Sequence, residues 1–276
     1  MYRAIFSTHR KSKIKKLLAQ KEYLPISHPI SSIKEFEGKV VLISGGSGGI
    51  GLSIAKSLME SGASVIIAGT NEKKLDKISK DISVDTVIMN YSRPETFKDV
   101  IGMVIEKYGH LDIFISSAGV HTEDVNFWAM NPEEFDRVMD INLKGVFFAC
   151  QSVGKYMIDN NIKGSILLIS SSRGSEPAWS PYGISKWGLK GLTEGLGQIF
   201  IPYGINVNSI APGSTATGLI GIKDGDSITS EENGMGRLVM PDEVATLAKL
   251  LVSDAGKMID GEVVHIAAGR GTFDIR

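Results

Sequence analysis

From Gly38 onward, short runs of apolar residues alternate with longer stretches in which apolar positions recur every three or four residues. The short runs have the length of buried strands, and the longer stretches have the period of helices that are apolar on one side. Such alternation predicts a doubly wound α/β fold, in which helices cover both faces of a parallel β-sheet. We expect strands at residues 40–44, 64–68, 86–89, 111–116, 165–168 and 205–210, and helices at 50–60, 72–81, 95–108, 147–157 and from Pro181 onward.

The helix predicted at 95–108 has a well-defined apolar face. Ser92 and Glu95 stand three residues apart at its start, which predicts a capping box. The residues of its apolar face are Phe97, Val100, Ile101, Val104, Ile105 and Tyr108.

The composition is that of a globular protein and excludes several classes. Of 276 residues, 42% are hydrophobic and 22% are charged, so disorder over most of the chain is excluded. No stretch approaches the ~20 consecutive apolar residues of a membrane-spanning helix. A net charge of −1 offers no general attraction for nucleic acid. The single cysteine, Cys150, allows no intrachain disulfide and no cysteine-rich metal site. We therefore expect a cytoplasmic protein without a metal ion.

Basic charge is concentrated at the N-terminus, where residues 1–21 hold seven basic residues and no acidic one. Ile14, Leu17 and Leu18 predict a short amphipathic helix that ends before Pro25. We expect an accessory arm over residues 1–37, followed by one folded domain over 38–276. An organelle transit peptide has a similar composition and remains an alternative. Nucleic-acid binding by the arm would depend strongly on salt, but we expect neither a nucleic-acid nor a membrane partner.

The first predicted strand leads through a glycine-rich turn, Ser-Gly-Gly-Ser-Gly-Gly-Ile-Gly at 44–51, directly into a helix. Gly45 permits a tight turn, Gly49 lets the backbone approach a diphosphate, and Gly51 permits close packing of the helix on the sheet. The N-terminus of the helix offers N–H groups to phosphates. This context favours a dinucleotide site over a flexible loop. The expected cofactor contacts in the turn are Gly45, Ser47, Gly49, Ile50 and Gly51.

The end of the second predicted strand indicates which dinucleotide binds. NAD sites usually place a carboxylate there to accept a hydrogen bond from the ribose 2′-hydroxyl. Gly69 and Thr70 stand at this point and carry no charge that would repel a 2′-phosphate. Lys73 and Lys74 follow, either as phosphate ligands or as solvated helix residues. We expect NADP(H) to be preferred over NAD(H).

Tyr182 and Lys186 stand four residues apart at the start of a predicted helix, which places both side chains on one face. Ser180 is the expected N-cap and Pro181 the first helical residue. A phenol with a pKa of ~10 is a poor acid–base catalyst at neutral pH. A nearby ammonium group and the helix N-terminus both favour the phenolate, so we expect them to lower the pKa of Tyr182. A tyrosine tuned in this way can protonate a forming alkoxide.

Several motifs follow the carboxyl ends of predicted strands. Ser170, Ser171 and Ser172 come after one strand, and Ala211-Pro212-Gly213 after another. In a parallel sheet these ends meet at one edge, where ligands bind. We therefore expect them to share one crevice with the glycine-rich turn.

Residues 38–270 resemble the short-chain dehydrogenase/reductase superfamily in its single-domain, Rossmann-type branch, and are similar to its 3-oxoacyl-(acyl-carrier-protein) reductase-like members. The motifs that carry the resemblance are SGGSGGIG, SSAG, INLKG, ISSSRG, YGISK and APGSTAT, in this order. The resemblance implies that residues 38–276 form a dinucleotide-binding catalytic domain. It also implies an NAD(P)-dependent oxidoreductase that moves a hydride between nicotinamide and a carbonyl or secondary alcohol.

The resemblance also assigns roles to residues. Ser171 would hydrogen-bond the substrate carbonyl and Tyr182 would donate the proton. Lys186 would bind the nicotinamide ribose and lower the pKa of Tyr182, and Asn142 would hold a water that links Lys186 to a proton relay. The further cofactor contacts that it implies are Thr70, Asn90, Ala118, Gly119, Pro212, Gly213, Thr215 and Thr217.

The chain departs from the family pattern in three places. Ser116-Ser117 replaces Asn-Asn before Ala118-Gly119, so that two amides which brace the sheet become shorter hydroxyls. Asn90, followed by Tyr91, replaces the aspartate that reads the adenine amine. Gly48 replaces a basic residue of many NADP-dependent members.

Substrate choice is expected to come from the loops around the site. Trp179 either forms a wall of the pocket or covers its own loop, and Arg173 either meets an anionic substrate group or forms a surface ion pair. His121 either faces the substrate or is an ordinary hydrogen-bonded loop histidine. Residues 214–236, rich in glycine, form either a lid that closes over the substrate or a plain loop.

Glycines recur along the helix that follows Tyr182, at positions 183, 188, 191, 195 and 197. An interior glycine costs up to ~1 kcal/mol relative to alanine, which suggests a close approach by another helix. The resemblance implies a symmetric dimer through this helix and the 147–157 helix, often paired into a homotetramer. Alternatives to a reductase of small-molecule carbonyl substrates are an epimerase or dehydratase of the same fold and a non-catalytic dinucleotide-binding scaffold.

Overall fold

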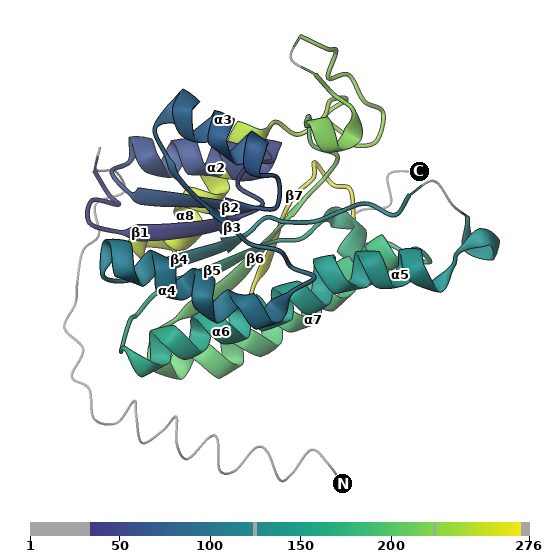
Figure 1. The fold of residues 1–276 in the computed structure, drawn as a ribbon. Coiled ribbons are helices and arrows are strands. Elements are labelled where there is room, and N and C mark those ends of the chain that lie inside the picture. Colours follow the sequence, from purple (N-terminus) through teal and green to yellow (C-terminus); the bar gives the residue numbers. More distant parts are fainter. Residues whose placement is uncertain (1–33, 124–125, 224, 272–276) are drawn as a thin grey trace, which may run out of the picture.

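The computed structural model describes residues 34–123, 126–223 and 225–271. Among these residues, seven parallel strands form one sheet in the order β3-β2-β1-β4-β5-β6-β7 (Figure 1). The strands are β1 (Val40–Ser44), β2 (Ser64–Gly69), β3 (Asp85–Ile88), β4 (Ile113–Ser116), β5 (Ser165–Ile169), β6 (Asn206–Pro212) and β7 (Val263–Ile266). The basic segment 1–21 and the helix predicted around Ile14 lie outside the described residues, as does all of the 1–37 arm except 34–37.

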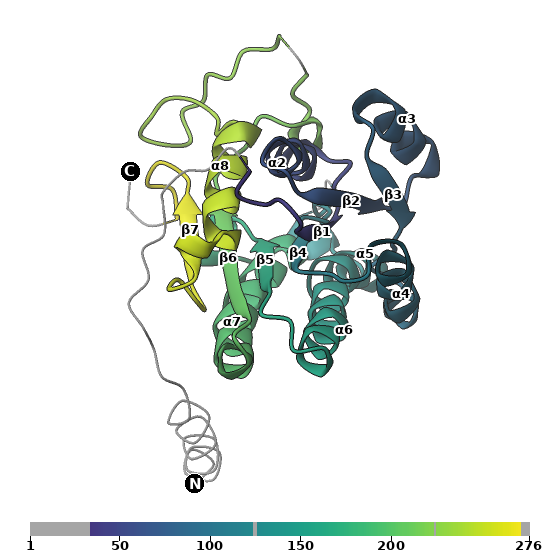
Figure 2. The same cartoon turned by 90° about the vertical axis from the view of Figure 1, so that its left-hand side faces the viewer.

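Helices cover both faces of the sheet, which confirms the predicted doubly wound fold (Figure 2). One face carries α2 (Gly49–Glu60), α3 (Glu72–Ile82) and α8 (Pro241–Val252). The other carries α4 (Phe97–Tyr108), α6 (Val146–Asp159) and α7 (Pro181–Phe200), while the short α5 (Pro132–Met139) precedes α6. Because the sheet is sandwiched, its central strands are buried along their whole length and read as continuous apolar runs.

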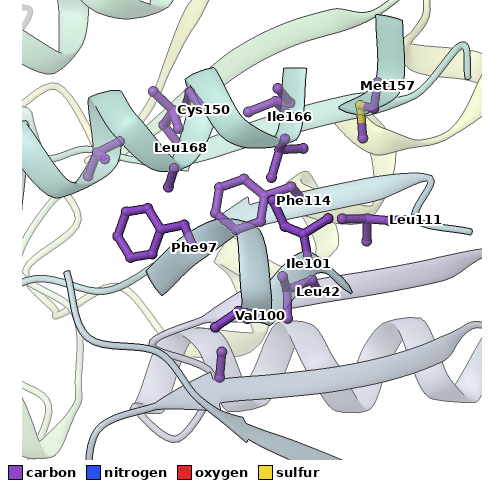
Figure 3. Close-up of a cluster of buried hydrophobic side chains, with 14 of the residues drawn as sticks. Leu42, Phe97, Val100, Ile101, Leu111, Phe114, Cys150, Met157, Ile166 and Leu168 are labelled. Atoms are coloured by element: carbon purple, nitrogen blue, oxygen red, sulfur yellow. The ribbon is translucent and has the colours of Figure 1, made fainter. Parts of the chain in front are cut away.

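The core on the α4–α6–α7 side shows how the apolar helix faces are used (Figure 3). Phe97, Val100 and Ile101 of α4 pack toward Phe114 of β4, as the helical period predicts. Cys150 of α6 lies in the same cluster, and its side chain is fully buried. Burial raises the pKa of the Cys150 thiol to about 12. The lone cysteine is therefore a structural apolar residue.

The predicted capping box at the start of α4 is wrong. Pro94 begins a 3-10 turn, Pro94–Thr96, so that the α-helix itself starts at Phe97 and Ser92 lies outside it. The N–H of Ser92 donates to Asn90 Oδ1 at 3.0 Å, and the Glu95 carboxylate pairs with Arg93 instead of reaching back. Local hydrogen bonds within the turn replace the reciprocal cap.

The glycines of α7 divide into two groups. A Cβ on Gly188 would lie 2.7 Å from Leu143 Cδ2, and one on Gly197 would lie 2.7 Å from Gly261 Cα. At Gly183 the obstacle is the Ala178 Cβ, also at 2.7 Å. Of these three neighbours, only Leu143 belongs to a helical segment, the π-helical turn Asp140–Gly145, so the expected approach by another helix is found at Gly188 alone. Around Gly191 and Gly195 there is nothing within 4 Å, so these two positions lie in open space.

The sheet register brings the expected functional turns together. Ser44 at the end of β1 pairs with Ser116 at the end of β4, and Ser116 in turn pairs with Leu168 of β5. Ile169, which ends β5, pairs with Ile210 of β6. The turns that leave these strands therefore meet at one edge of the sheet, on either side of the point where the strand order reverses between β1 and β4.

Candidate active site

A cleft of about 700 Å³ opens at this edge. It is lined by the glycine-rich turn, the turns after β2, β3, β4, β5 and β6, and the start of α7. Every cofactor contact expected from the sequence lines it, and so does Ser171. Asn142 does not line the cleft but lies directly behind Gly119. The predicted residues thus lie in or directly behind one cleft, and their individual roles remain predictions.

The glycine-rich turn is built so closely that side chains are excluded. Gly45 has φ +66°, and a Cβ there would lie 2.5 Å from the Ala118 N atom. A Cβ on Gly51 would lie 2.5 Å from the Gly45 carbonyl oxygen. A Cβ on Gly49 would meet Thr217 Cγ2 at 2.6 Å. The positive φ at Gly45 confirms the tight turn expected there. At Gly51 the close neighbours are the backbone atoms of Gly45 and Gly46 in the turn, and not the sheet.

The helix that follows the turn presents free donors to the cleft. Gly48 is the N-cap of α2 and brings no capping side chain, so the first N–H groups of the helix remain open to a ligand. Together with the side-chain-free turn, these donors fit a dinucleotide diphosphate. The structure thus provides a cradle of the kind that the sequence predicted.

Where the cleft meets the end of β2 and the start of α3, its described lining residues include no carboxylate. The lining residues that come from the end of β2 and the start of α3 are Gly69, Thr70 and Lys74. A Cβ on Gly69 would lie 3.5 Å from Ser47 Oγ, so the hydroxyl of the glycine-rich turn faces this corner. Asn71 is occupied as the N-cap of α3, where its Oδ1 accepts from the Lys74 N–H at 3.0 Å.

Asn142 is fixed in a short π-helical turn, Asp140–Gly145, that joins α5 to α6. Its side chain is fully buried and exchanges two hydrogen bonds of 2.8 Å with the backbone of Val120. A Cβ on Gly119 would lie 3.4 Å from Asn142 Oδ1 and 3.8 Å from Lys186 Nζ. Asn142, Gly119 and Lys186 are therefore immediate neighbours. The sequence analysis did not predict this π-turn, and the role of Asn142 remains a prediction.

Tyr182 and Lys186 stand in the first turns of α7. Ser180 Oγ accepts from the Gly183 N–H at 3.2 Å and Pro181 is the first helical residue, as predicted. Lys186 Nζ donates to the Ile169 carbonyl at 3.1 Å and lies 5.6 Å from the centre of the Tyr182 ring. Ser171 lines the same part of the cleft, and its hydroxyl favours the Tyr182 phenolate. The predicted hydroxyl, phenol and ammonium groups thus converge on one wall of the cleft.

The electrostatics of this wall differ from the sequence prediction. Burial raises the pKa of Tyr182, and the hydrogen bond from Ser171 and the charges of Arg173 and Arg270 offset this only in part. Burial also lowers the pKa of Lys186 to about 8. The expectation that Lys186 and the helix N-terminus lower the pKa of Tyr182 is therefore wrong for the protein alone, because withdrawal of the phenolate from water is the larger effect.

The loop residues considered for substrate choice have distinct surroundings. The His121 ring stacks on the Tyr182 ring, with centres 4.2 Å apart and planes inclined by 24°. Partial burial and the charges of Lys186 and Arg173 lower the pKa of His121. Arg173 forms an ion pair with Glu176 at 2.8 Å, and Trp179 lines the cleft while half of its surface stays exposed.

Sequence reasoning missed Arg270. Its guanidinium donates to Glu176 Oε1 at 3.0 Å and to Ser214 Oγ at 3.0 Å, and also forms a short contact with Glu232. Arg270 therefore links the end of the described chain to two loops. One is the serine-rich loop after β5, residues 170–176, and the other is the loop 214–236. The sequence analysis did not predict β7 and so had no signal for Arg270. With β7 known, a charged residue shortly after this strand lies at the same edge of the sheet as the other turns.

The loop 214–236 follows β6 and contributes Leu219, Ile220 and Glu232 to the cleft. It appears as the long green segment at the top of Figure 1. Its closure over a substrate remains a prediction.

Across residues 34–123, 126–223 and 225–271, no cluster of histidine, cysteine or acidic side chains is suited to hold a metal ion. Nor does this part of the chain contain a helix long and apolar enough to cross a membrane.

Known proteins share both the sequence pattern and the fold. A family model described as short chain dehydrogenase matches residues 39–224. The 3-oxoacyl-[acyl-carrier-protein] reductase FabG of Thermotoga maritima is 33% identical over 243 residues, covering 84% of this chain and 98% of that protein. The FabG of Rickettsia conorii is 36% identical over 240 residues, covering 85% and 98%.

A solved structure shows the same relationship in three dimensions. The 3-ketoacyl-(acyl-carrier-protein) reductase of Brucella melitensis, solved in complex with NADH, superimposes with a TM-score of 0.77 at 27% identity. The match covers 85% of this chain and 99% of that one.

Proposed function

Because the chain belongs to the short-chain dehydrogenase family and is an NAD(P)-dependent oxidoreductase of carbonyl and hydroxyl groups, we propose that it reduces a 3-oxoacyl thioester with NADPH. The observation that carries the proposal is the convergence of Ser171, Tyr182 and Lys186 on one wall of a dinucleotide cleft. The thioester substrate is supported by the relatives named 3-oxoacyl-[acyl-carrier-protein] reductase, which match over nearly their whole length.

Each catalytic residue has one role in the proposed mechanism. When bound, the nicotinamide supplies a hydride. Ser171 and Tyr182 bind the substrate carbonyl oxygen, and Tyr182 gives this oxygen its phenolic proton as negative charge develops. The raised pKa of Tyr182 keeps the phenol protonated at neutral pH, as a proton donor requires. Lys186 stabilises the phenolate that remains, and Asn142 connects Lys186 to the relay that restores the proton.

Cofactor binding is assigned to the turns around the cleft. The diphosphate would be held by Gly45, Gly49 and the first N–H groups of α2. The 2′-phosphate of NADPH would receive hydrogen bonds from Ser47, Thr70 and Lys74. The preference for NADPH rests on the absence of a carboxylate among the cleft residues that come from the end of β2 and the start of α3. The remaining proposed cofactor contacts are Ile50, Gly51, Asn90, Ala118, Gly119, Tyr182, Lys186, Pro212, Gly213, Thr215 and Thr217.

The proposal extends to the assembly of the protein. Phe147, Ile184 and Trp187 expose much of their apolar surface on α6 and α7, and Gly191 and Gly195 leave space for a neighbour. We expect a symmetric dimer through these helices, paired further into a tetramer. Sedimentation of the wild type and of a Gly191→Arg variant tests this, since the variant should sediment as a smaller species. Sedimentation of the wild type as a monomer would contradict the proposed assembly.

Residues 38–276 are proposed to form the dinucleotide-binding catalytic domain, with 1–37 as an accessory arm whose Phe36 packs into the core of that domain. The protein is proposed to be cytoplasmic. Deletion of residues 1–33 tests the division of the chain. The shortened protein should keep its cofactor affinity and turnover, whereas loss of either would place part of the site in the arm. Microscopy of a fusion protein tests the location.

The decisive experiment measures binding and turnover separately. NADPH and NADH are titrated by fluorescence, and acetoacetyl-CoA is then offered as a small 3-oxoacyl thioester. We expect tighter binding of NADPH, turnover in the wild type, and a loss of about 10²–10⁴-fold in kcat for Tyr182→Phe with little change in cofactor affinity. Turnover that survives in Tyr182→Phe would remove Tyr182 from the mechanism. An absence of thioester reduction, with other carbonyl compounds reduced, would overturn only the substrate.

A further inference from the structure

A buried cluster of three hydroxyl groups lies where the sheet meets the cofactor cleft. Tyr91 follows β3, and its hydroxyl lies 2.5 Å from Ser44 Oγ and 2.8 Å from Ser116 Oγ. Tyr91 is 3% exposed, Ser44 1% and Ser116 2%, so the three hydroxyl groups hydrogen-bond to one another out of reach of solvent. Ser44 and Ser116 are the last residues of β1 and β4 and face each other in the register. The Tyr91 hydroxyl therefore bridges the two central strands at their carboxyl ends.

These two strands carry the two turns that must stay in contact at the cofactor site. Gly45 directly follows β1, Ala118 follows β4 after one residue, and a Cβ on Gly45 would lie only 2.5 Å from the Ala118 N atom. The Ser117 N–H donates to the Ser44 carbonyl at 3.0 Å, which continues the pairing beyond the strands. Any widening between Ser44 and Ser116 would separate these turns. The hydroxyl bridge thus adds a side-chain link to the backbone pairing at the point where the two turns meet.

The sequence explains why a bridge of this kind is needed here. At positions 116 and 117 the chain has two serines, where the family pattern has two amides that brace the sheet. Within the described residues, no hydrogen bond joins the two serine hydroxyls directly, and each bonds to Tyr91 instead. Tyr91 reaches across from the β3 side and provides one hydroxyl that can donate to one serine and accept from the other. Burial raises the pKa of Tyr91, so the group stays a neutral phenol.

The ring of Tyr91 makes a separate set of contacts. It packs edge-on against Phe97 at 5.5 Å between ring centres. A Cβ on Gly145 would lie 2.6 Å from the Cβ of Tyr91, so the base of the side chain supports the end of the π-turn that carries Asn142. The hydroxyl and the ring therefore contact different parts of the site. This separation allows the two contributions to be tested independently.

We propose that Tyr91 is a positioning residue for the dinucleotide, whose hydroxyl holds the ends of β1 and β4 at the spacing that cofactor binding requires. The inference concerns the site of the proposed function, but it depends only on dinucleotide binding and not on the substrate or on the role of Tyr182.

The test compares Tyr91→Phe with the matched variant Tyr108→Phe. Tyr108 of α4 also donates its hydroxyl to a partner, Asp85, but does not line the cleft. For Tyr91→Phe we expect the dissociation constant of whichever dinucleotide the wild type binds to rise roughly tenfold, because two buried hydroxyls lose their partner. At saturating cofactor, kcat should stay within about twofold, since the ring is retained. Tyr108→Phe should leave the dissociation constant unchanged.

Two further variants separate positioning from a general loss of stability. Tyr91→Val removes the ring as well and should also lower kcat, through the turn that carries Asn142. Ser116→Asn added to Tyr91→Phe returns an amide to the strand end and should recover most of the lost affinity. If Tyr91→Phe fails to fold, Ser116→Ala provides the milder loss of the same bridge and should weaken binding.

An unchanged dissociation constant in Tyr91→Phe, or equal losses in the Tyr91 and Tyr108 variants, would overturn the proposal. Because the readout is cofactor binding, a protein that binds dinucleotide but reduces no thioester would contradict the proposed substrate while leaving this measurement intact.

Discussion

The two walls of the cleft are built by opposite means. The wall formed by β1, the glycine-rich turn and α2 consists of backbone, and several of its positions have no room for even a methyl group. The opposite wall consists of side chains held by hydrogen bonds and ion pairs. These side chains come from the serine-rich loop, α7, the loop 214–236 and Arg270. The first wall requires glycines that leave room for neighbouring backbone, whereas the second requires particular hydroxyl, amino and guanidinium groups. Substitutions in the two walls should therefore fail in different ways.

The largest effect is expected at Gly45, where an alanine must adopt φ +66° and would contact Ala118 N. We expect Gly45→Ala to weaken dinucleotide binding by at least about 100-fold, from backbone strain and overlap together. Gly102→Ala is the matched control, because Gly102 lies within α4 with nothing within 4 Å of its added Cβ. It should leave binding unchanged and raise stability by up to ~1 kcal/mol. Equal affinities in a fluorescence titration would contradict the steric account of this wall.

A chemical substitution in the opposite wall should spare binding and affect turnover. Ser171→Ala removes the hydroxyl that favours the Tyr182 phenolate and one proposed donor for the substrate oxygen. We expect kcat to fall by about 10²-fold while the cofactor dissociation constant changes little. Ser175→Ala removes a neighbouring hydroxyl that hydrogen-bonds His265 at 3.0 Å and does not line the cleft, so its kcat should stay near the wild-type value. A large loss of affinity in Ser171→Ala would show that the two walls are not separable.

The charge of Arg270 should be visible in the pH profile. The guanidinium favours the Tyr182 phenolate and so lowers the pKa of Tyr182 against the effect of burial. Arg270→Gln should raise this pKa, which moves the rise of alcohol oxidation to higher pH and leaves reduction near neutral pH unchanged, because the phenol is already protonated there.

Arg93→Gln is the control for a lost guanidinium, since Arg93 pairs with Glu95 on an exposed surface and does not line the cleft. Its oxidation profile should coincide with that of the wild type. A shift toward lower pH in Arg270→Gln would contradict the assignment of the Arg270 charge.

The smallest effect concerns the base of the loop 214–236, where Arg237 pairs with Glu243 at 2.6 Å. Hydrogen bonds from Arg237 and from the Met240 N–H lower the pKa of Glu243 from 4.5 to about 2. A carboxylate with a lowered pKa stabilises the fold above its ordinary pKa, and this contribution is lost as the pH falls from about 4.5 toward 2.

Glu243→Gln should therefore reduce the free energy of unfolding at neutral pH by less than ~1 kcal/mol, since the pair is partly exposed to solvent. The difference from the wild type should shrink in urea unfolding as the pH is lowered through this range. A difference that grows toward acid pH would contradict the assignment.

The features that sequence reasoning predicted are those set by local pattern. The strand and helix periods, the glycine-rich turn and the Ser180-Pro181 cap depend on neighbours within a few residues, and the structure has them. The capping box at Ser92 failed for a local reason as well, because Pro94 imposed a 3-10 turn.

The missed features depend on residues far apart in the chain. Arg270 meets Glu176 across 94 positions, and the bridge from Tyr91 reaches Ser44 across 47. The direction of the Tyr182 pKa shift likewise follows from burial, which exists only in the folded chain. A residue type and its spacing reveal the chemistry available, whereas the surrounding dielectric is a property of tertiary packing.

The lone cysteine provides an internal reporter of opening motions. Cys150 is fully buried beneath α6 and its pKa is raised to about 12, so a thiol reagent is excluded both by access and by protonation. Modification then requires α6 to move away from the sheet, and its rate under native conditions measures the free energy of that opening. Since the chain has no second cysteine, all thiol labelling reports on Cys150, and no other cysteine has to be removed by mutation. Dinucleotide that binds the closed state should slow the labelling in proportion to its occupancy.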